Sequence, residues 1–384
     1  MSKIASKRLG DLITLKRGYD LPEKVRVVGP YPVISSAGIS GYHNEFKVEG
    51  PGVVTGRYGT LGEMYYAEGR YWPHNTALYV QDFKGNDPKY IYYLLGCLGR
   101  IRTSDKSAVP GVNRNELHEM EIPAISDPSV QLKVRKVLET IDKKIALNNR
   151  INAELEAMAK TLYDYWFVQF DFPDANGKPY KTSGGKMEYN ATLKREIPGG
   201  WNVKTLSQIA NITMGQSPAG ESYNDEGNGT LFFQGSTDFG WLFPSPRQYT
   251  TSPARMAKKG DILLSVRAPV GDMNIANADC CIGRGLAALN SKSGSDGFLF
   301  YVMKYFKQVF ERRNSEGTTF GSITKDDLHS LSVAYPQSDL LEKYDDIVSS
   351  YNKIIFVRSL ENRDLVKFRD WLLPMLMNGQ VTVR

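Results

Sequence analysis

The sequence predicts an α+β protein in which two similar globular domains are separated by two long helices that form an antiparallel coiled coil. Apolar residues recur at helical spacing in two long segments, and the second half of the chain repeats features of the first. The 384 residues exceed one ordinary core. We divide the chain into a first globule at 1–127, a spacer helix at 128–168, a second globule with its connector at 169–335, and a C-terminal spacer helix at 336–384.

Each globule is expected to be compact, with short strands, long loops and one helix. Runs rich in β-branched and aromatic residues, such as "GVVTGR" and "ILLSVR", alternate with Gly, Pro and Asn turns at close intervals. We expect the helices at 88–102 in the first globule and 295–313 in the second. Residues 170–201 are rich in Gly, Pro and Lys, which indicates a connector between the halves.

The two long helices are expected over Val130–Trp166 and Leu340–Leu376. In both segments apolar residues fall at the a and d positions of heptads, which is the pattern of a coiled-coil seam. An isolated helix cannot bury such a stripe, so the simplest partner of each stripe is the other one.

Both seams become polar at their centre. The polar residues are Asn148 and Asn152 in the first helix and Arg358 and Asn362 in the second. If the helices are antiparallel, Asn148 comes opposite Asn362 and the globules lie at opposite ends. A buried polar layer penalises shifted registers, so we expect these residues to fix the register and the distance between the globules. The alternative is a polar waist that is open to solvent or to a partner chain.

Composition excludes several classes of protein. With 41% hydrophobic and 23% charged residues the chain resembles a soluble globular protein, and no apolar run approaches the ~18 residues of a membrane span. The N-terminus lacks the apolar core of a signal peptide, and three cysteines are too few for a disulfide framework, so we expect a cytoplasmic protein. No His or Cys spacing predicts a metal site. The net charge of +6 is compatible with a polyanionic partner but does not require one.

Motifs of enzymes that act on nucleic acid are missing. The chain has no Pro-Pro-aromatic motif of an amino-methyltransferase, no acidic-x-Lys triplet after Pro173–Asp174, and no Walker A loop. These absences favour a binding subunit over an enzyme. Two similar domains on a rigid spacer are typical of a dimeric DNA reader, here made from one chain. Because the globules have diverged, they would read two different half-sites.

Five stretches carry a resemblance to a known family. They are "YPVISSAGISGYHNEFKVEGPGVVTGRYGTLG", "LYDYWFVQFDFP", "GGKMEYNATLKREIPGGW", "MGQSPAGESYN" and "WLLPMLMNGQV". Through them the chain resembles, over essentially its full length, the specificity subunit of type I restriction-modification enzymes.

This resemblance implies a non-catalytic subunit with two target-recognition domains, each followed by a helical spacer. It implies that the spacers pack as an antiparallel coiled coil and dock two modification (methyltransferase) subunits, which methylate adenine in each half-site of double-stranded DNA. Restriction/translocase subunits would add ATP-driven translocation and cleavage. S-adenosylmethionine, ATP and Mg are therefore expected on the partner subunits, and no cofactor on this chain.

The candidate DNA-binding residues are side chains on loops that can reach bases or phosphates. In the first globule they are Lys16, Arg17, Tyr42, His43, Asn44, Arg57, Tyr58, Lys106, Asn113 and Arg114. In the second they are Gln216, Ser217, Gln234, Arg267, Arg284, Thr318, Thr319, Ser322 and Lys325. We favour Arg57 and Arg267, because both precede a Gly or Pro turn at nearly matching points of the repeat.

Two other functions are compatible with the sequence. The chain could be a coiled-coil assembly scaffold whose globules bind protein partners without DNA specificity. It could also be a self-sufficient nuclease or methyltransferase, which would turn over DNA without a partner subunit.

Overall fold

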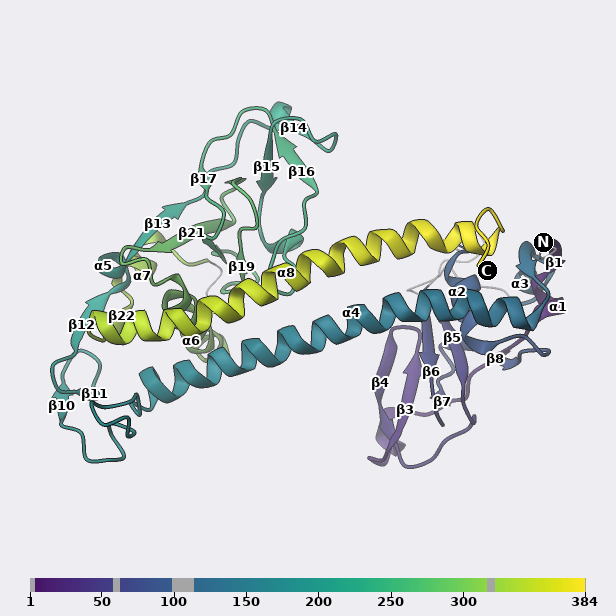
Figure 1. The fold of residues 1–384 in the computed structure, drawn as a ribbon, viewed down its shortest axis with the longest axis horizontal. Helices are drawn as coiled ribbons and strands as arrows, with labels where there is room; N and C mark the ends of the chain where they lie inside the picture. Colours follow the sequence, from purple (N-terminus) through teal and green to yellow (C-terminus); the bar gives the residue numbers. More distant parts are fainter. Residues whose placement is uncertain (1–3, 58–62, 99–113, 316–321, 384) are drawn as a thin grey trace. The chain divides into compact units, whose positions relative to one another are not determined.

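The computed structural model describes residues 4–57, 63–98, 114–315 and 322–383. The chain forms two compact units: Met1–Arg150 with Arg358–Arg384 (unit 1), and Ile151–Val357 (unit 2). Each long helix contributes to both units. They are α4 (Pro128–Tyr163) and α8 (Ser338–Met377), within three residues of the bounds expected from periodicity (Figure 1).

The first globule supplies the strands and short helices of unit 1. In chain order they are β1 (Ile4–Arg8), α1 (Leu9–Leu12), β2 (Thr14–Arg17), η1 (Glu23–Val25), β3 (Tyr31–Ser35), β4 (Gly38–His43), β5 (Gly52–Gly56), β6 (Met64–Ala67), β7 (Trp72–Pro73), β8 (Ala77–Asp82), α2 (Pro88–Gly96), α3 (Arg114–Glu119) and β9 (Glu121–Ile125).

The second globule supplies those of unit 2. They are a π-helical turn η2 (Asp164–Val168), β10 (Met187–Asn190), β11 (Arg195–Pro198), β12 (Asn202–Thr205), α5 (Leu206–Ile209), β13 (Ala210–Met214), η3 (Gly220–Ser222), β14 (Tyr223–Asn224), β15 (Thr230–Phe233), η4 (Ser236–Asp238), β16 (Gln248–Thr250), β17 (Met256–Ala257), β18 (Ile262–Ser265), β19 (Met273–Ile275), β20 (Cys280–Ile282), β21 (Leu286–Ser291), α6 (Asp296–Ser315), α7 (Lys325–Ser330) and β22 (Ser332–Tyr335).

The two globules share one strand arrangement. A four-stranded sheet has the order β2-β8-β5-β6 in the first and β13-β21-β18-β19 in the second. A second sheet in each contains a parallel pair, β3 with β7 and β15 with β20. A separate antiparallel pair joins the start of each globule to its end, β1 with β9 and β12 with β22. The duplication predicted from the sequence is therefore confirmed in the topology.

Unit 1 buries an apolar core where α2 and the four-stranded sheet meet the two long helices. Val134 and Leu138 of α4 lie in this core with Ile91 of α2 and Leu372 of α8. In unit 2 the corresponding core contains α6, the start of α8 and the end of α4. The apolar positions of the predicted seams are buried or half-buried in these cores, which is why the periodicity extends along each helix.

Within unit 1 the two long helices run antiparallel, as predicted. Asp142 of α4 accepts a hydrogen bond from Arg369 of α8 at 3.0 Å. Farther along α4, Asn148 contacts Asn362, which lies earlier in α8 (Figure 1).

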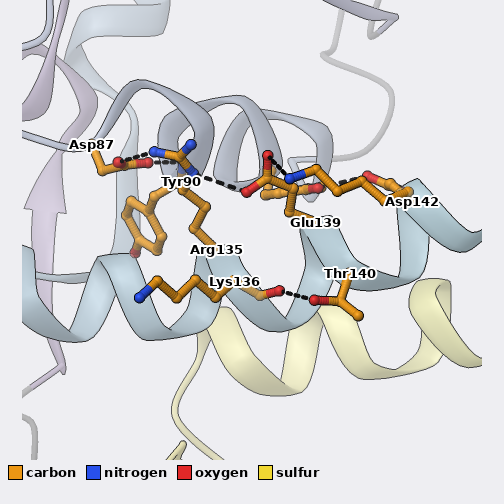
Figure 2. A network of polar contacts seen from close by, with 9 residues as sticks. Asp87, Tyr90, Arg135, Lys136, Glu139, Thr140 and Asp142 are labelled. Atoms are coloured by element: carbon orange, nitrogen blue, oxygen red, sulfur yellow. Dashed lines mark hydrogen bonds and ion pairs between the residues drawn. The ribbon is translucent and has the colours of Figure 1, made fainter.

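Polar contacts fix α2 of the first globule on α4 (Figure 2). Asp87 caps α2 by accepting from the Tyr90 amide at 2.8 Å, and its other oxygen accepts from Arg135 of α4 at 2.9 Å. The Tyr93 hydroxyl donates to Asp142 at 2.6 Å. These side chains are buried or half-buried, so we expect them to contribute more than an exposed ion pair.

Unit 2 fixes its own helix α6 in a comparable way. Asp345 of α8 accepts a hydrogen bond from the Phe298 amide in the first turn of α6 at 3.2 Å, and burial raises the pKa of its carboxyl. The Tyr301 hydroxyl donates to the Glu156 carbonyl of α4 at 3.3 Å, and Lys304 forms an ion pair with the Glu156 carboxylate. Each globule is thus joined by side chains to the long helices of its unit.

Within the described residues, no helix combines the length and apolar character needed to cross a membrane.

Candidate nucleic-acid interface

In the second globule, several strands end at the same edge. The last residues of β13 and β18 pair with the beginning of β21, and the last residues of the parallel strands β15 and β20 pair with each other. The segment from Gly283 to Gly285 joins β20 to β21 and lies where these ends meet. Loops at such an edge present side chains from several strands on one surface.

Polar side chains from these loops contact each other. Ser217 Oγ donates to Gln234 Oε1 at 3.0 Å and accepts from the Arg284 amide at 3.3 Å. The backbone amide of Gln216 donates to the Ile282 carbonyl at 2.9 Å, which places Gln216 beside Ser217, Gln234 and Arg284. The structure therefore brings together four of the residues that the sequence nominated.

Two further candidates adjoin this group. Arg267 and Ser322 form an isolated antiparallel bridge, and a cavity of about 320 Å³ is lined by Arg267 and by Gly285. We call the six residues Gln216, Ser217, Gln234, Arg267, Arg284 and Ser322 the second strand-end cluster. Arg and Gln side chains are typical readers of guanine and adenine edges.

The first globule has an equivalent group at the β7–β8 junction. Arg17 Nε donates to the Asn75 carbonyl at 3.3 Å, and the Asn75 amide group donates to Asp20 at 2.6 Å. The Arg57 amide donates to the Thr76 carbonyl at 3.0 Å, and Thr76 Oγ1 lies 3.1 Å from His74 Nδ1. The first strand-end cluster consists of Arg17, Asp20, Arg57, His74, Asn75 and Thr76.

Burial lowers the pKa of His74, and Arg26 acts in the same direction. A neutral imidazole at pH 7 offers one hydrogen-bond donor and one acceptor. Sequence reasoning missed the segment from His74 to Thr76. The signal was available in the repeat, because "PHNTAL" occupies the place that "IGRGLA" has in the second half.

Ladder hydrogen bonds correct one equivalence between the globules. The backbone amide of Arg57 donates to the Thr76 carbonyl, and at the same point of the shared strand arrangement the Val266 amide donates to the Gly285 carbonyl. Arg57 is therefore equivalent to Val266, and Arg267 lies one residue farther along its loop. Both arginines follow the ends of equivalent strands, β5 and β18, but their side chains leave the backbone at different positions.

Three candidates lie at the opposite end of β3 from the first strand-end cluster. Tyr42 and His43 pair with the beginning of β3, and the Asn44 amide donates to the Val27 carbonyl at 3.0 Å. His43 is only 5% exposed, and its ring packs edge-on against Trp72 at 5.3 Å between centroids. We therefore withdraw His43 as a DNA contact, because its side chain is part of the packing. Tyr42 and Asn44 are exposed.

The remaining described candidates are basic. Lys16 is half-buried, with Nζ 5.6 Å from the Tyr19 ring centroid. Arg114 and Lys325 are exposed and occupy the same position, as first residues of the equivalent helices α3 and α7. The other candidates lie outside the described residues: Tyr58, Lys106, Asn113, Thr318 and Thr319.

At the polar centre of the helix pair in unit 1, Asn148 is buried, and Arg358 and Asn362 are half-buried. Asn148 Nδ2 donates to Asn362 Oδ1 at 2.9 Å and to Glu361 at 2.7 Å, and Asn148 Oδ1 accepts from Arg358 at 2.8 Å. The pairing of Asn148 with Asn362 is thus present, while a role of this layer in fixing the register stays a prediction. Asn152 is buried in unit 2.

Among the residues that the structure describes, no group of three or more His, Cys, Asp or Glu side chains is arranged to hold a metal ion.

A family model described as "Type I restriction modification DNA specificity domain" matches residues 1–157 and 198–355. The two matches cover most of the chain and follow its two halves. The chain belongs to this family.

Relatives agree with this membership. The chain is 30% identical over 313 residues to the putative type I restriction enzyme MjaX specificity subunit of Methanocaldococcus jannaschii, covering 78% of this chain and 69% of the relative. It is 23% identical over 317 residues to the HindI specificity subunit of Haemophilus influenzae, covering 67% and 68%. Among solved structures, the type I S subunit from M. genitalium has the same fold, with a TM-score of 0.65 at 17% identity and 97% and 96% of the two chains covered.

Proposed function

We propose that this member of the specificity family reads a bipartite, asymmetric site in double-stranded DNA, with one globule on each half-site. The observation that supports it is the duplicated strand frame with different side chains at equivalent places. Arg284 of the second globule is equivalent to Asn75 of the first, and Gln216 is equivalent to Tyr19. Because Arg and Asn select different bases, two such clusters would select two different half-sites.

Contacts to phosphates would come from basic residues at equivalent positions. Arg114 and Lys325 begin α3 and α7 and are both exposed, so each globule offers one cation at the same point of its frame. Phosphate contacts position a protein on the duplex without reading its sequence.

The long helices would dock two methyltransferase subunits. In unit 1, Phe368 and Trp371 of α8 are exposed and their rings stack at 6.0 Å between centroids. In unit 2, Met158 of α4 is exposed and takes the place in the repeat that Phe368 takes in α8. Exposed apolar side chains at equivalent places, Met158 and Phe368, would give each unit one contact point for a copy of the same partner.

The chain itself would not be catalytic. The methyl donor S-adenosylmethionine would be bound by the methyltransferase subunits, and ATP and Mg by restriction/translocase subunits that join the complex. The purified chain is therefore expected to give no DNA turnover alone, with either Mg or the methyl donor added.

A salt titration with target duplex tests the proposal. The target is first obtained by mapping methylated adenines in cells that carry the complete system. The logarithm of the affinity should then fall linearly with the logarithm of salt concentration, and the target should be preferred over scrambled duplex at each salt concentration. A protein-binding scaffold would show no preference for the target at any salt concentration.

A further inference from the structure

The second globule has a loop that the first lacks. Residues 234–247 connect β15 to β16, whereas only residues 36–37 connect the equivalent strands β3 and β4. The loop begins at Gln234 of the second strand-end cluster. Because the surrounding frame is the same in both globules, this loop is a difference in surface and not in fold.

Hydrogen bonds of side chains and backbone link the loop to itself and to Asn274. Arg247 Nε donates to Asp238 Oδ1 at 2.6 Å, and the Ser245 amide donates to the Asp238 carbonyl at 2.9 Å. Asn274 is only 1% exposed and binds Gly240 on both sides, accepting from its amide and donating to its carbonyl, each at 3.0 Å. The loop therefore loses little conformational entropy if it binds a partner.

Trp241 follows the residue that Asn274 holds, and its side chain is 54% exposed. An indole leaves apolar area in water when it is exposed, so burial of this ring against a partner would be favourable. Trp is also an efficient contact residue, because it adds a large apolar area with few rotatable bonds.

Two adjoining cavities connect Trp241 to the second strand-end cluster. A cavity of about 490 Å³ is lined by Trp241 and Lys307, and the cavity of about 320 Å³ by Arg267. Ser236 and Asp272 line both cavities, so the two are neighbours.

The lysines that line the larger cavity have anionic partners. Lys307 pairs with Asp272 at 2.6 Å, and Lys160 with Asp164 at 2.5 Å. Charge alone therefore does not mark the groove as a phosphate site. The distinguishing feature is the exposed indole beside the cluster.

We propose that loop 234–247 is a specificity element of the second globule and that Trp241 packs against deoxyribose and base edges of the second half-site. The inference rests on the proposed DNA-reading function and adds a contact beyond the strand-end cluster. It predicts sequence preference at one or more positions of the second half-site that has no equivalent in the first, because the first globule has only Ser36 and Ala37 at this place. Apolar contact with a thymine methyl group is one way in which such a side chain reads sequence.

The test uses the complex of the full chain with its methyltransferase subunits. Duplexes carry the mapped target with one base pair changed at a time in either half-site, and dissociation constants are measured at fixed salt. Trp241→Ala should lower the affinity for the unchanged target about tenfold, the size of one base-pair mismatch. It should also remove the preference at one or more positions of the second half-site and leave every preference in the first half-site intact.

Two variants serve as controls. Tyr189→Ala removes another exposed aromatic ring of unit 2, 69% exposed in the β10–β11 hairpin and away from both cavities, and should leave all affinities unchanged. Trp241→Phe keeps an aromatic ring and should keep most of the affinity. Unfolding midpoints of the variants should equal that of the unchanged chain, because the replaced rings are exposed.

The outcomes separate this inference from the proposed function. If the unchanged complex shows no sequence preference, the proposed function fails. If it is specific and Trp241→Ala keeps the same affinities and preferences, only the role of the loop fails. An equal loss on target and on scrambled duplex also overturns the role in specificity.

Discussion

Asn148 and Asn362 donate and accept across the helix pair of unit 1 at 2.9 Å, and the apolar Ile145 and Leu365 lie next to them on one side along the seam. Arg358 donates to the same Asn148 side chain at 2.8 Å. Removal of Asn148 therefore leaves three polar groups of α8, on Arg358, Glu361 and Asn362, without that partner. A buried polar group without a partner costs about 1–3 kcal/mol.

We predict that Asn148→Ala lowers the free energy of unfolding by about 1–3 kcal/mol. Asn362→Ala should lower the free energy of unfolding less in the Asn148→Ala chain than in the unchanged chain, because the two changes remove the same hydrogen bond. Denaturant unfolding of the four proteins of this double-mutant cycle measures the coupling. Additivity within about 0.5 kcal/mol would contradict the view that these residues act as a pair.

A second prediction concerns Asp142, which joins three helices. It accepts from Tyr93 of α2 at 2.6 Å and from Arg369 of α8 at 3.0 Å. Asp142→Ala should destabilise unit 1 by about 1–3 kcal/mol, because it leaves a half-buried guanidinium and a buried hydroxyl without this acceptor. Lys143→Ala is the matched control, since that side chain is exposed on the next position of α4. Equal unfolding midpoints for the two variants would refute the role of Asp142.

The long helices could be predicted because one spacing repeats over many turns, and its apolar positions, such as Val134 and Val348, are buried or half-buried against the partner helix or the adjacent globule. Their polar centre was equally visible, because Asn148 interrupts a regular seam. Neither inference depended on the loops of the globules.

The strand-end residues could be predicted only in part, for a physical reason. Loops of different length separate equivalent strands, so no single shift of the sequence aligns Tyr19 with Gln216 and also Asn75 with Arg284. Ladder hydrogen bonds establish these equivalences. His43 was a sequence-based candidate, but Trp72, which is distant in sequence, packs against its ring and His43 is buried.

A third prediction assigns one half-site to each strand-end cluster. Arg284→Ala should weaken discrimination in the second half-site about tenfold, and Arg17→Ala should do so in the first, since one bidentate arginine contributes about 1–3 kcal/mol of base discrimination. Competition with duplexes changed in one half-site at a time measures both effects. If either variant weakens both half-sites equally, the assignment of one globule to each is wrong.

A fourth prediction follows from Asp345, whose carboxyl has a raised pKa because burial disfavours its charged form. The folded chain therefore holds this proton to a higher pH than the unfolded chain. The contribution to stability is complete below the unfolded-state pKa and is lost as pH rises through the folded-state pKa.

Asp345→Asn keeps an acceptor for the Phe298 amide and removes the charge. It should raise the unfolding midpoint at pH 8 relative to the unchanged chain, and the gain should disappear at pH 3.5. Asp346→Asn, at the exposed neighbouring position, controls for net charge, and an equal gain at both pH values would contradict the prediction.

The last prediction addresses the distance between half-sites, which we expect the helix pair to set. One heptad inserted into each long helix, at the unit boundaries after Arg150 and after Val357, keeps the seam in phase and lengthens each helix by roughly 10 Å. At about 3.4 Å per base pair, the preferred gap should grow by about three base pairs, while both half-site sequences stay the same. Seven residues make about two complete helical turns, so each globule keeps its orientation about the helix axes.

The duplex, however, rotates by roughly 100° over the added base pairs. The lengthened chain should therefore bind its best target more weakly than the unchanged chain binds its own. Selection from duplexes that carry both half-sites at every gap measures the preference. A variant with four residues inserted at the same places loses the phase of the seam. We expect this variant to have a lower unfolding midpoint than the heptad variant. If the heptad variant folds and still selects the original gap, the helices do not set the spacing.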